Sequence, residues 1–157
     1  MSRGLDRRTV MAAGALAAAG LARAPAQAQS LQEMDMATAL KLVLGDRKPE
    51  AGKVALDLPL VAGSGNSVAL KVTVDSPMTP QDHVRRIHVF GEANPRPHIL
   101  TAEFGPRAGR AEVSTNIRLA RSQSVWAFAE TSDGRLWVAS RSIDVTIGAC
   151  DSLMFKY

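Results

Sequence analysis

The sequence predicts an all-β fold, an antiparallel β-sandwich of seven or eight strands with one N-terminal helix. From Lys53 onward, apolar and polar residues alternate in short runs, which is the period of half-buried strands. Gly, Pro, Asn and Asp separate these runs at a spacing of roughly ten residues, as is typical of β-sandwiches. Before Lys53, one stretch has helical spacing of its apolar residues, and no second convincing helix follows. These observations together favour a sandwich.

The first residues have the features of an export signal. Arg7 and Arg8 precede a mild apolar run, Val10–Leu21, that consists mostly of Ala and Gly, and Ala26–Ala28 provides a cleavage site. The pattern resembles a twin-arginine (Tat) signal, and its apolar run is shorter than the about 20 residues that span a membrane. We therefore expect residues 1–28 to direct export to the periplasm, with no membrane partner. An uncleaved anchor and a chance arginine pair are the alternatives.

The chain without this segment is close to neutral. Residues 1–28 contain four arginines and one aspartate, so their removal lowers the formal charge from +4 to +1. The remaining chain has no basic run of the kind that follows nucleic-acid phosphates. We expect one domain with a modest core and no nucleic-acid partner.

Residues Gln32–Gly45 are predicted to form the helix. The apolar residues among them have a mostly helical spacing, acidic residues fall in the first turn, and Gly45 is placed as a stop. The simplest role for such a helix is to pack an amphipathic face on the core. Residues 46–52 then form a polar connector, so residues 29–52 make up the helix and connector that precede the sandwich.

The sandwich is expected to occupy residues 53–147. The clearest alternation is in the stretch 68–74, and Gly63–Asn66 before it is predicted to be a hairpin-type connection. The runs predicted to form strands are 54–58, 68–74, 84–90, 99–104, 111–119, 125–130, 136–140 and 143–147.

Cys150 is the only thiol in the 157 residues, so covalent chemistry would be centred there. It follows the last predicted strand after two small residues, Gly148 and Ala149, which are expected to form a flexible arm in the segment 148–157. A sulfur on such an arm could enter the pocket of another protein. Two alternatives stand beside this reading: a buried cysteine that acts as a small hydrophobe, and a disulfide that links two copies of the chain.

Other chemistries find little support in the sequence. No Ser/His/Asp arrangement or glycine-rich phosphate loop can be assembled, and Trp126 and Trp137 are expected to fill the sandwich. Three histidines within sixteen residues could in principle bind a metal with a nearby carboxylate, but their spacing gives weak support. We expect neither a metal site nor a cofactor. The residues considered as metal ligands are His83, His88, His98, Asp82 and Glu103.

Five longer motifs occur in a fixed order along the chain, with Gly45-Asp46 and Leu56–Pro59 before them. They are Asp75–Thr79, Ile87–Pro97, Ala111–Ala120, Ser132–Trp137 and Val145–Cys150. In this order they closely resemble SoxY, the sulfur carrier subunit family of thiosulfate oxidation. The likeness covers nearly all of the chain after residue 28.

This resemblance implies an immunoglobulin-like sandwich that forms a heterodimer with a SoxZ-type subunit. It also implies that Cys150 is the covalent attachment site for sulfur, with Gly148 and Ala149 as its arm. The protein would be a carrier and not an enzyme, and a covalent sulfur adduct would take the place of a cofactor. Its other partners would be periplasmic sulfur-oxidising enzymes.

The chain departs from the family pattern around the cysteine, where the family has Gly-Gly-Cys-Gly-Gly. Ala149 replaces one glycine, and Asp151 and Ser152 follow the cysteine as candidate modulators. A carboxylate at Asp151 disfavours the thiolate, and the segment Leu153–Tyr157 adds apolar bulk. A divergent SoxY-like paralogue that binds a partner, delivers sulfur elsewhere or regulates assembly is therefore the alternative, with the cysteine structural or bridging two chains.

Overall fold

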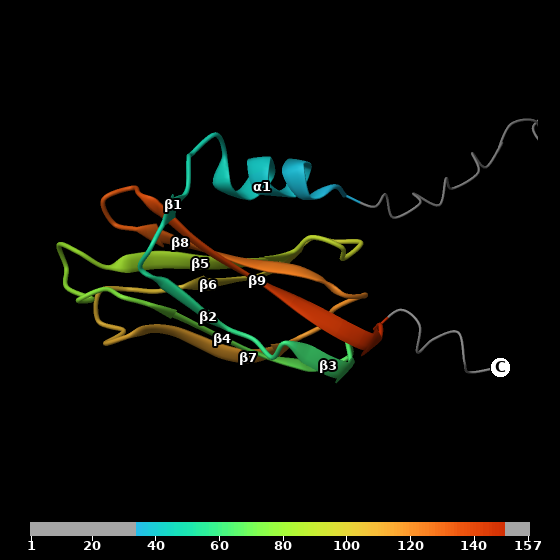
Figure 1. Ribbon diagram of the computed structural model, residues 1–157. Coiled ribbons are helices and arrows are strands. Elements are labelled where there is room, and N and C mark those ends of the chain that lie inside the picture. The colour runs from blue at the N-terminus through green and yellow to red at the C-terminus, as the bar shows by residue number, and fades with distance from the viewer. Residues whose placement is uncertain (1–33, 150–157) are drawn as a thin grey trace, which may run out of the picture. The chain divides into compact units, whose positions relative to one another are not determined.

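The computed structural model of the protein describes residues 34–149, and these form one helix and nine strands (Figure 1). The predicted export signal, Cys150, Asp151, Ser152 and Leu153–Tyr157 lie outside the described residues. The elements are α1 (Met36–Leu44), β1 (Glu50–Ala51), β2 (Val54–Asp57), β3 (Val61–Ser64), β4 (Val68–Val74), β5 (Val84–Gly91), β6 (His98–Glu103), β7 (Ala111–Ile117), β8 (Gln123–Thr131) and β9 (Leu136–Ile147).

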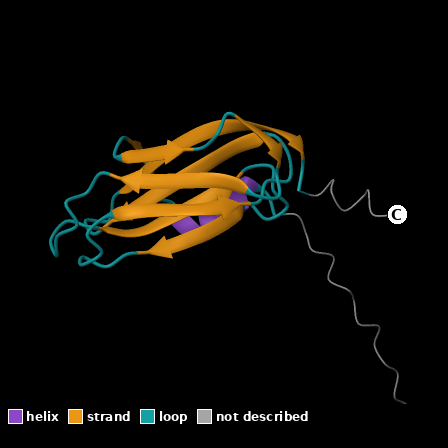
Figure 2. Ribbon diagram, turned by 90° about the horizontal axis from the view of Figure 1, so that it is seen from below, coloured by secondary structure: helices purple, strands orange, loops and turns teal. Residues whose placement is uncertain are grey.

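The strands form two layers, which confirms the predicted all-β class (Figure 2). The larger sheet has the order β1-β9-β8-β5-β6, with β3 also pairing with β9. The smaller sheet has the order β2-β4-β7. Most neighbours are antiparallel, but the short strands β1 and β3 both run parallel to β9.

The main core lies between the two sheets. In β4, residues 68, 70, 72 and 74 are buried and face this core, while the residues between them are exposed or half-buried. In β5, Ile87 and Val89 contribute from the other sheet and are fully buried. Each such aliphatic side chain stabilises the fold by about 1.5–3 kcal/mol relative to its exposed state, which is why the alternation in sequence fixes the faces of the strands.

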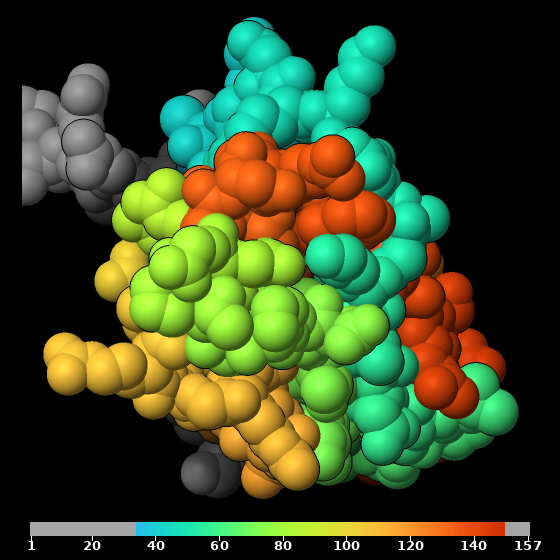
Figure 3. Space-filling view, turned by 90° about the vertical axis from the view of Figure 1, so that its left-hand side faces the viewer, coloured from blue at the N-terminus to red at the C-terminus, as the bar shows by residue number. Residues whose placement is uncertain are grey.

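The helix covers the outer face of the larger sheet, where a second apolar cluster forms. Ala39 and Leu44 pack there with Phe90, Phe128 and Leu136. In the space-filling view, the helix and its connector lie over the loop between β8 and β9 (Figure 3).

Capping residues at both ends explain where the helix begins and ends. Asp35 accepts a hydrogen bond from the Thr38 backbone N–H at 3.2 Å and so is the N-cap, one residue before the helix begins. Gly45 has φ of 68° and ends the helix, as the sequence predicts. The expected helix was Gln32–Gly45, whereas the described helix is Met36–Leu44.

Two strand predictions were wrong in detail. The predicted strands 136–140 and 143–147 are one strand, β9, because Ser140, Arg141 and Ser142 continue the ladder with β8 despite their polar sequence. The predicted hairpin connection Gly63–Asn66 is partly strand, because Ala62 and Ser64 in β3 pair with the distant β9. Such non-local pairing leaves no periodic signal in a segment this short.

The two tryptophans lie on opposite faces of the larger sheet. Trp137 packs against the core between the sheets, as expected, and Lys53 Nζ lies 5.2 Å from its ring centroid. Trp126 instead packs outside the sandwich beside Phe128, under α1.

The described residues, 34–149, contain no helix with the length and apolar character that a membrane span requires.

Candidate functional site

The candidate site is the point where the chain leaves the sandwich toward Cys150. The last strand, β9, ends at Ile147, and β3 ends beside it because the two strands are parallel. Gly148 is buried and Ala149 is half-buried. The structure therefore describes the chain up to Ala149, the residue that precedes the cysteine.

Three main-chain hydrogen bonds join the residue after β3, the loop after β7 and the end of the described chain. The Gly65 N–H donates to the Ile147 carbonyl at 2.7 Å, the Leu119 N–H donates to the Gly65 carbonyl at 2.8 Å, and the Ala149 N–H donates to the Leu119 carbonyl at 3.0 Å. We call Gly65, Leu119, Ile147 and Ala149 the exit junction. The Ala149 N–H, in the segment predicted to form a flexible arm, is thus hydrogen-bonded to the sandwich body.

The exit junction requires glycine at position 65. A Cβ atom built there would overlap the Leu119 carbonyl oxygen and would lie 3.0 Å from the Ala149 nitrogen and 3.1 Å from Val145 Cγ1. Two of these neighbours are backbone atoms, which cannot rotate away. The backbone of residue 65 approaches the exit so closely only because it carries no side chain.

A partly buried amide network supports the loop that contains Leu119. Asn94, between β5 and β6, donates through Nδ2 to the Arg118 carbonyl at 3.0 Å. Its Oδ1 accepts from the Ala120 N–H at 2.9 Å and from Gln123 Nε2 at 2.9 Å. The loop after β5 therefore positions the loop after β7, and that loop holds Ala149.

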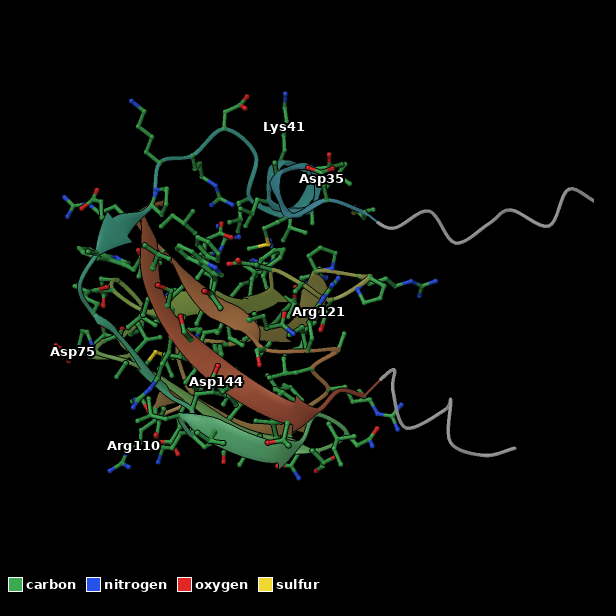
Figure 4. All side chains as sticks on the ribbon, turned by 45° about the vertical axis from the view of Figure 1, so that its right-hand side comes forward. Asp35, Lys41, Asp75, Arg110, Arg121 and Asp144 are labelled. Carbon is green, nitrogen blue, oxygen red and sulfur yellow. The ribbon has the colours of Figure 1, made fainter. Side chains whose placement is uncertain are left out.

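The exposed cations at this end are arginines. Arg118 and Arg121 are exposed and flank the loop whose Leu119 carbonyl binds Ala149 (Figure 4 labels Arg121). Cations of this kind favour anionic ligands and the thiolate form of a nearby cysteine.

Sequence reasoning missed the residues that build the exit junction. Gly65 was assigned to a turn, and Leu119 was assigned to the end of a strand. Asn94 and Gln123 carried no assigned role of their own, although Asn94 lies within one of the family-like motifs. The one available signal was the glycine, since glycine is the residue used where two backbones approach closely.

The histidines do not gather into a metal site within the described part of the chain, which contains no group of three or more potential His, Cys, Asp or Glu ligands. His88 Nδ1 and His98 Nε2 lie 2.8 Å and 2.9 Å from the same hydroxyl oxygen, Thr101 Oγ1. His83 Nδ1 lies 3.1 Å from the Thr79 carbonyl oxygen, apart from the other two.

His88 points to the outer face of the larger sheet, opposite to Ile87 and Val89, as the alternation predicts. It is only 4% exposed, and its Nε2 atom is buried without a hydrogen-bond partner. Burial lowers the pKa of His88 below its usual value, and the neighbouring His98 lowers it further. The neutral imidazole is therefore the favoured form.

A pocket of about 510 Å³ lies between α1 and the outer face of the larger sheet. Its walls are mainly apolar and include Leu40, Trp126 and Phe128. Its cation, Arg47, is already bound by Glu130 at 2.9 Å and by the Leu44 carbonyl at 2.9 Å. The pocket thus offers apolar surface and no nucleophile among its lining residues.

Comparison with known proteins identifies the family. The model of the family described as "Sulfur oxidation protein SoxY" matches residues 40–150, so the match runs through the exit junction to the cysteine. The chain belongs to the SoxY family. No curated protein gives a match.

Solved structures support the same fold. The sulfur carrier protein SoxY from Chlorobium limicola f thiosulfatophilum is 24% identical, with a TM-score of 0.60 over 72% of this chain and 97% of that chain. A superoxide reductase (neelaredoxin) from Ignicoccus hospitalis is 19% identical, with a TM-score of 0.54 over 60% of this chain and 80% of that chain. At these identities the likenesses show a shared sandwich fold.

Proposed function

We propose that this SoxY-family protein is a periplasmic sulfur carrier that holds thiosulfate-derived sulfur covalently on Cys150. The observation that carries the proposal is the family match over residues 40–150, which extends to the only thiol of the chain. The solved SoxY that shares the fold is itself named a sulfur carrier protein. The protein is then a substrate that other enzymes load and unload, and not a catalyst.

The chemistry requires a thiol outside the core and an electron acceptor. The Cys150 thiolate and the terminal sulfur of thiosulfate form an S–S bond, and the two electrons released pass to a partner redox enzyme. The product, Cys150–S–S–SO₃⁻, is a disulfide-like linkage that another thiol or enzyme can exchange. No metal held by this chain is needed for that step.

The geometry of the exit junction supports this role. The junction anchors the chain as far as Ala149 through the bond to Leu119, so the residue that follows is attached to a fixed point on the body. Arg118 and Arg121 flank Leu119 in the sequence and are exposed, so they add positive charge that can attract an anion such as thiosulfate to this end of the sandwich, although Arg121 Nε also donates to the Ala93 carbonyl at 3.5 Å. A SoxZ-like subunit as heterodimer partner, export by the Tat pathway and periplasmic sulfur-oxidising enzymes complete the proposal.

The experiment is to incubate the purified protein with thiosulfate and sulfur-oxidising enzymes and to measure its intact mass. We expect a heavier species that carries sulfur and sulfonate groups, that disappears on reduction, and that Cys150→Ser abolishes. If only the unmodified mass is recovered while an established SoxY is loaded in parallel, the carrier role is wrong for these partners.

A second candidate function follows from the departures around the cysteine. Ala149 and Asp151 replace the glycines of the family pattern, and Leu153–Tyr157 adds apolar residues. These changes favour a divergent paralogue that binds a SoxZ-like partner and delivers sulfur elsewhere or regulates assembly. That candidate predicts a stable complex with the partner subunit but no loading by the thiosulfate-oxidising enzymes.

A further inference from the structure

The pocket between α1 and the outer face of the larger sheet takes no part in the exit junction. One of its walls belongs to the sheet, where Trp126 and Phe128 of β8 lie on the same face and Val138 of β9 is paired with Phe128. The other wall is an apolar stripe along α1, whose residues follow one another at helical spacing: Met36, Leu40 and Leu44. We call this cavity the helix pocket.

The helix pocket lies over β8 and β9, where α1 does not close against the sheet. The helix backbone contacts the edge strand β6, and in the cluster under the helix Ala39 and Phe90 are 1% and 0% exposed. Leu40, Trp126 and Val138 are apolar pocket residues that are only half-buried. The volume of about 510 Å³ is in the range of about 300–1,000 Å³ of small-molecule sites. A ligand of that size would remove the remaining apolar surface from water.

The charges of the lining differ in whether they are compensated. Arg47 pairs with Glu130 at 2.9 Å. Glu92 is exposed, and none of the residues 34–149 forms an ion pair with it, including Arg121, which lines a neighbouring pocket with it. Trp126 Nε1 donates to Glu92 Oε2 at 3.4 Å, so this carboxylate lies beside the indole ring. The uncompensated charge of the helix pocket is therefore negative and lies at Trp126.

A carboxylate beside an indole ring suits an organic cation. The face of the ring attracts a cation within about 6 Å of its centroid, and tryptophan does so most strongly among the aromatic side chains. The ring of Phe128 continues the apolar wall, because its centroid is 6.5 Å from that of Trp126 and the two rings are parallel to within 13°. An ammonium group on an apolar body fits both features, whereas Glu92 repels an anionic group.

We propose that the helix pocket binds a small organic cation with an apolar body, of the alkylammonium class. The cationic group lies at Glu92 and Trp126, and the apolar body lies between Leu40 and Phe128. This site goes beyond the proposed carrier function, because its lining contains neither Cys150 nor a residue of the exit junction. Failure of sulfur loading would leave the site intact, and failure of cation binding would leave the carrier function intact.

The test measures the binding of octyltrimethylammonium and octyl sulfate to the full chain by calorimetry, below the concentrations at which they form micelles. The two probes share an alkyl chain and differ in the sign of the head group. The formal charge of the chain is +4, so unspecific attraction favours the anion. We expect the cation to bind about tenfold more tightly than the anion and to change the fluorescence of Trp126. Equal affinities, or tighter binding of the anion, would overturn the proposal.

Two variants of single carboxylates locate the charge. Glu92→Gln should weaken binding of octyltrimethylammonium about tenfold and leave binding of the uncharged octanol unchanged, because it removes the charge and keeps the acceptor of the Trp126 bond. Asp57→Asn is the matched control, since Asp57 is an exposed carboxylate on β2 of the smaller sheet. The same affinity in both variants would mean that the cation does not bind at Glu92.

A third variant locates the apolar body. Leu40→Trp should abolish binding of both octyltrimethylammonium and octanol, because the larger side chain fills the helix pocket. The urea midpoint shows whether this variant is folded, and if it is not, the comparison of Glu92→Gln with Asp57→Asn decides. Undiminished binding to folded Leu40→Trp would place the probe elsewhere and would contradict the proposal.

Discussion

At the scale of single residues, the charge around the exit junction is set by a few exposed side chains. Arg118 and Arg121 flank Leu119, whose carbonyl binds Ala149. Asp151 follows the cysteine directly in the sequence, and a carboxylate next to a thiol disfavours the thiolate and an anionic cargo. Arg118 and Arg121 carry the opposite charge, so they are the residues to change first in a test of how charge guides the cargo.

Replacing both Arg118 and Arg121 with Gln should slow the loading of thiosulfate on Cys150 by about tenfold at low ionic strength, because the anion is no longer attracted to the exit. The rate is measured by intact mass against time. Arg110→Gln is the matched control, since Arg110 is exposed at the start of β7, at the other end of that strand from the exit (Figure 4). A double variant that loads at the wild-type rate would show that these cations do not guide the cargo.

His88 makes stability depend on pH. Its pKa is lowered in the folded state by burial, so its full contribution is present above the unfolded value of 6.5. As the pH falls below 6.5, the unfolded chain binds the proton first, and the free energy of unfolding falls by at most about 1.4 kcal/mol per pH unit. The groups that face this ring are Thr101, His98, Glu130, Arg86 and Arg47.

The measurement is the urea midpoint between pH 7.5 and pH 5, which should decrease with acidification. His88→Gln should flatten the profile, whereas His83→Gln should retain it. A slope that survives the His88 substitution would assign the pH dependence to other groups.

At the scale of elements, the alternation of apolar and polar residues predicted the strands better than the turn residues predicted the connections between them. The alternation of residues 68–74 predicted the right faces, because one side of that strand is buried in the core and the other is solvated. In residues 111–117 only the two ends, Ala111 and Ile117, are buried, and Thr115 on the face expected to be buried is exposed. The helix end at Gly45 was also predicted, since its glycine cap is a local signal.

The elements that build the exit junction could not be predicted in this way. β3 is four residues long, and its parallel partner β9 lies about eighty residues later in the chain. The bond between Ala149 and Leu119 likewise joins segments that are remote in sequence. The sequence located the cysteine, but only the structure shows how far the chain before it is anchored.

Gly65→Ala should destabilise the protein by about 2–3 kcal/mol, because the added methyl group overlaps the Leu119 carbonyl oxygen and presses on Ala149. Gly63→Ala is the matched control, since a Cβ there meets nothing within 4 Å. Urea unfolding compares the two variants, and hydrogen exchange at the Ala149 amide should increase in Gly65→Ala alone. Equal midpoints for both variants would mean that the junction tolerates a side chain.

At the scale of the whole molecule, several loops and strand ends of the sandwich meet at the exit junction. The loops after β5 and β7 and the ends of β3 and β9 meet there through the bonds of Asn94, Leu119 and Gly65. The all-β class, the single helix and the SoxY family were predicted from the sequence, and the structure and the family match confirm them. The attachment of sulfur to Cys150 remains the central proposal.

The most direct measurement of that proposal is the intact mass of the protein purified without reductant from the cells that produce it naturally. If Cys150 carries sulfur, we expect heavier species that differ from the unmodified chain by sulfur or sulfonate groups, that collapse to one mass after reduction, and that are absent from Cys150→Ser. A single unmodified mass under conditions in which the cells oxidise thiosulfate, or an adduct that persists in Cys150→Ser, would contradict it.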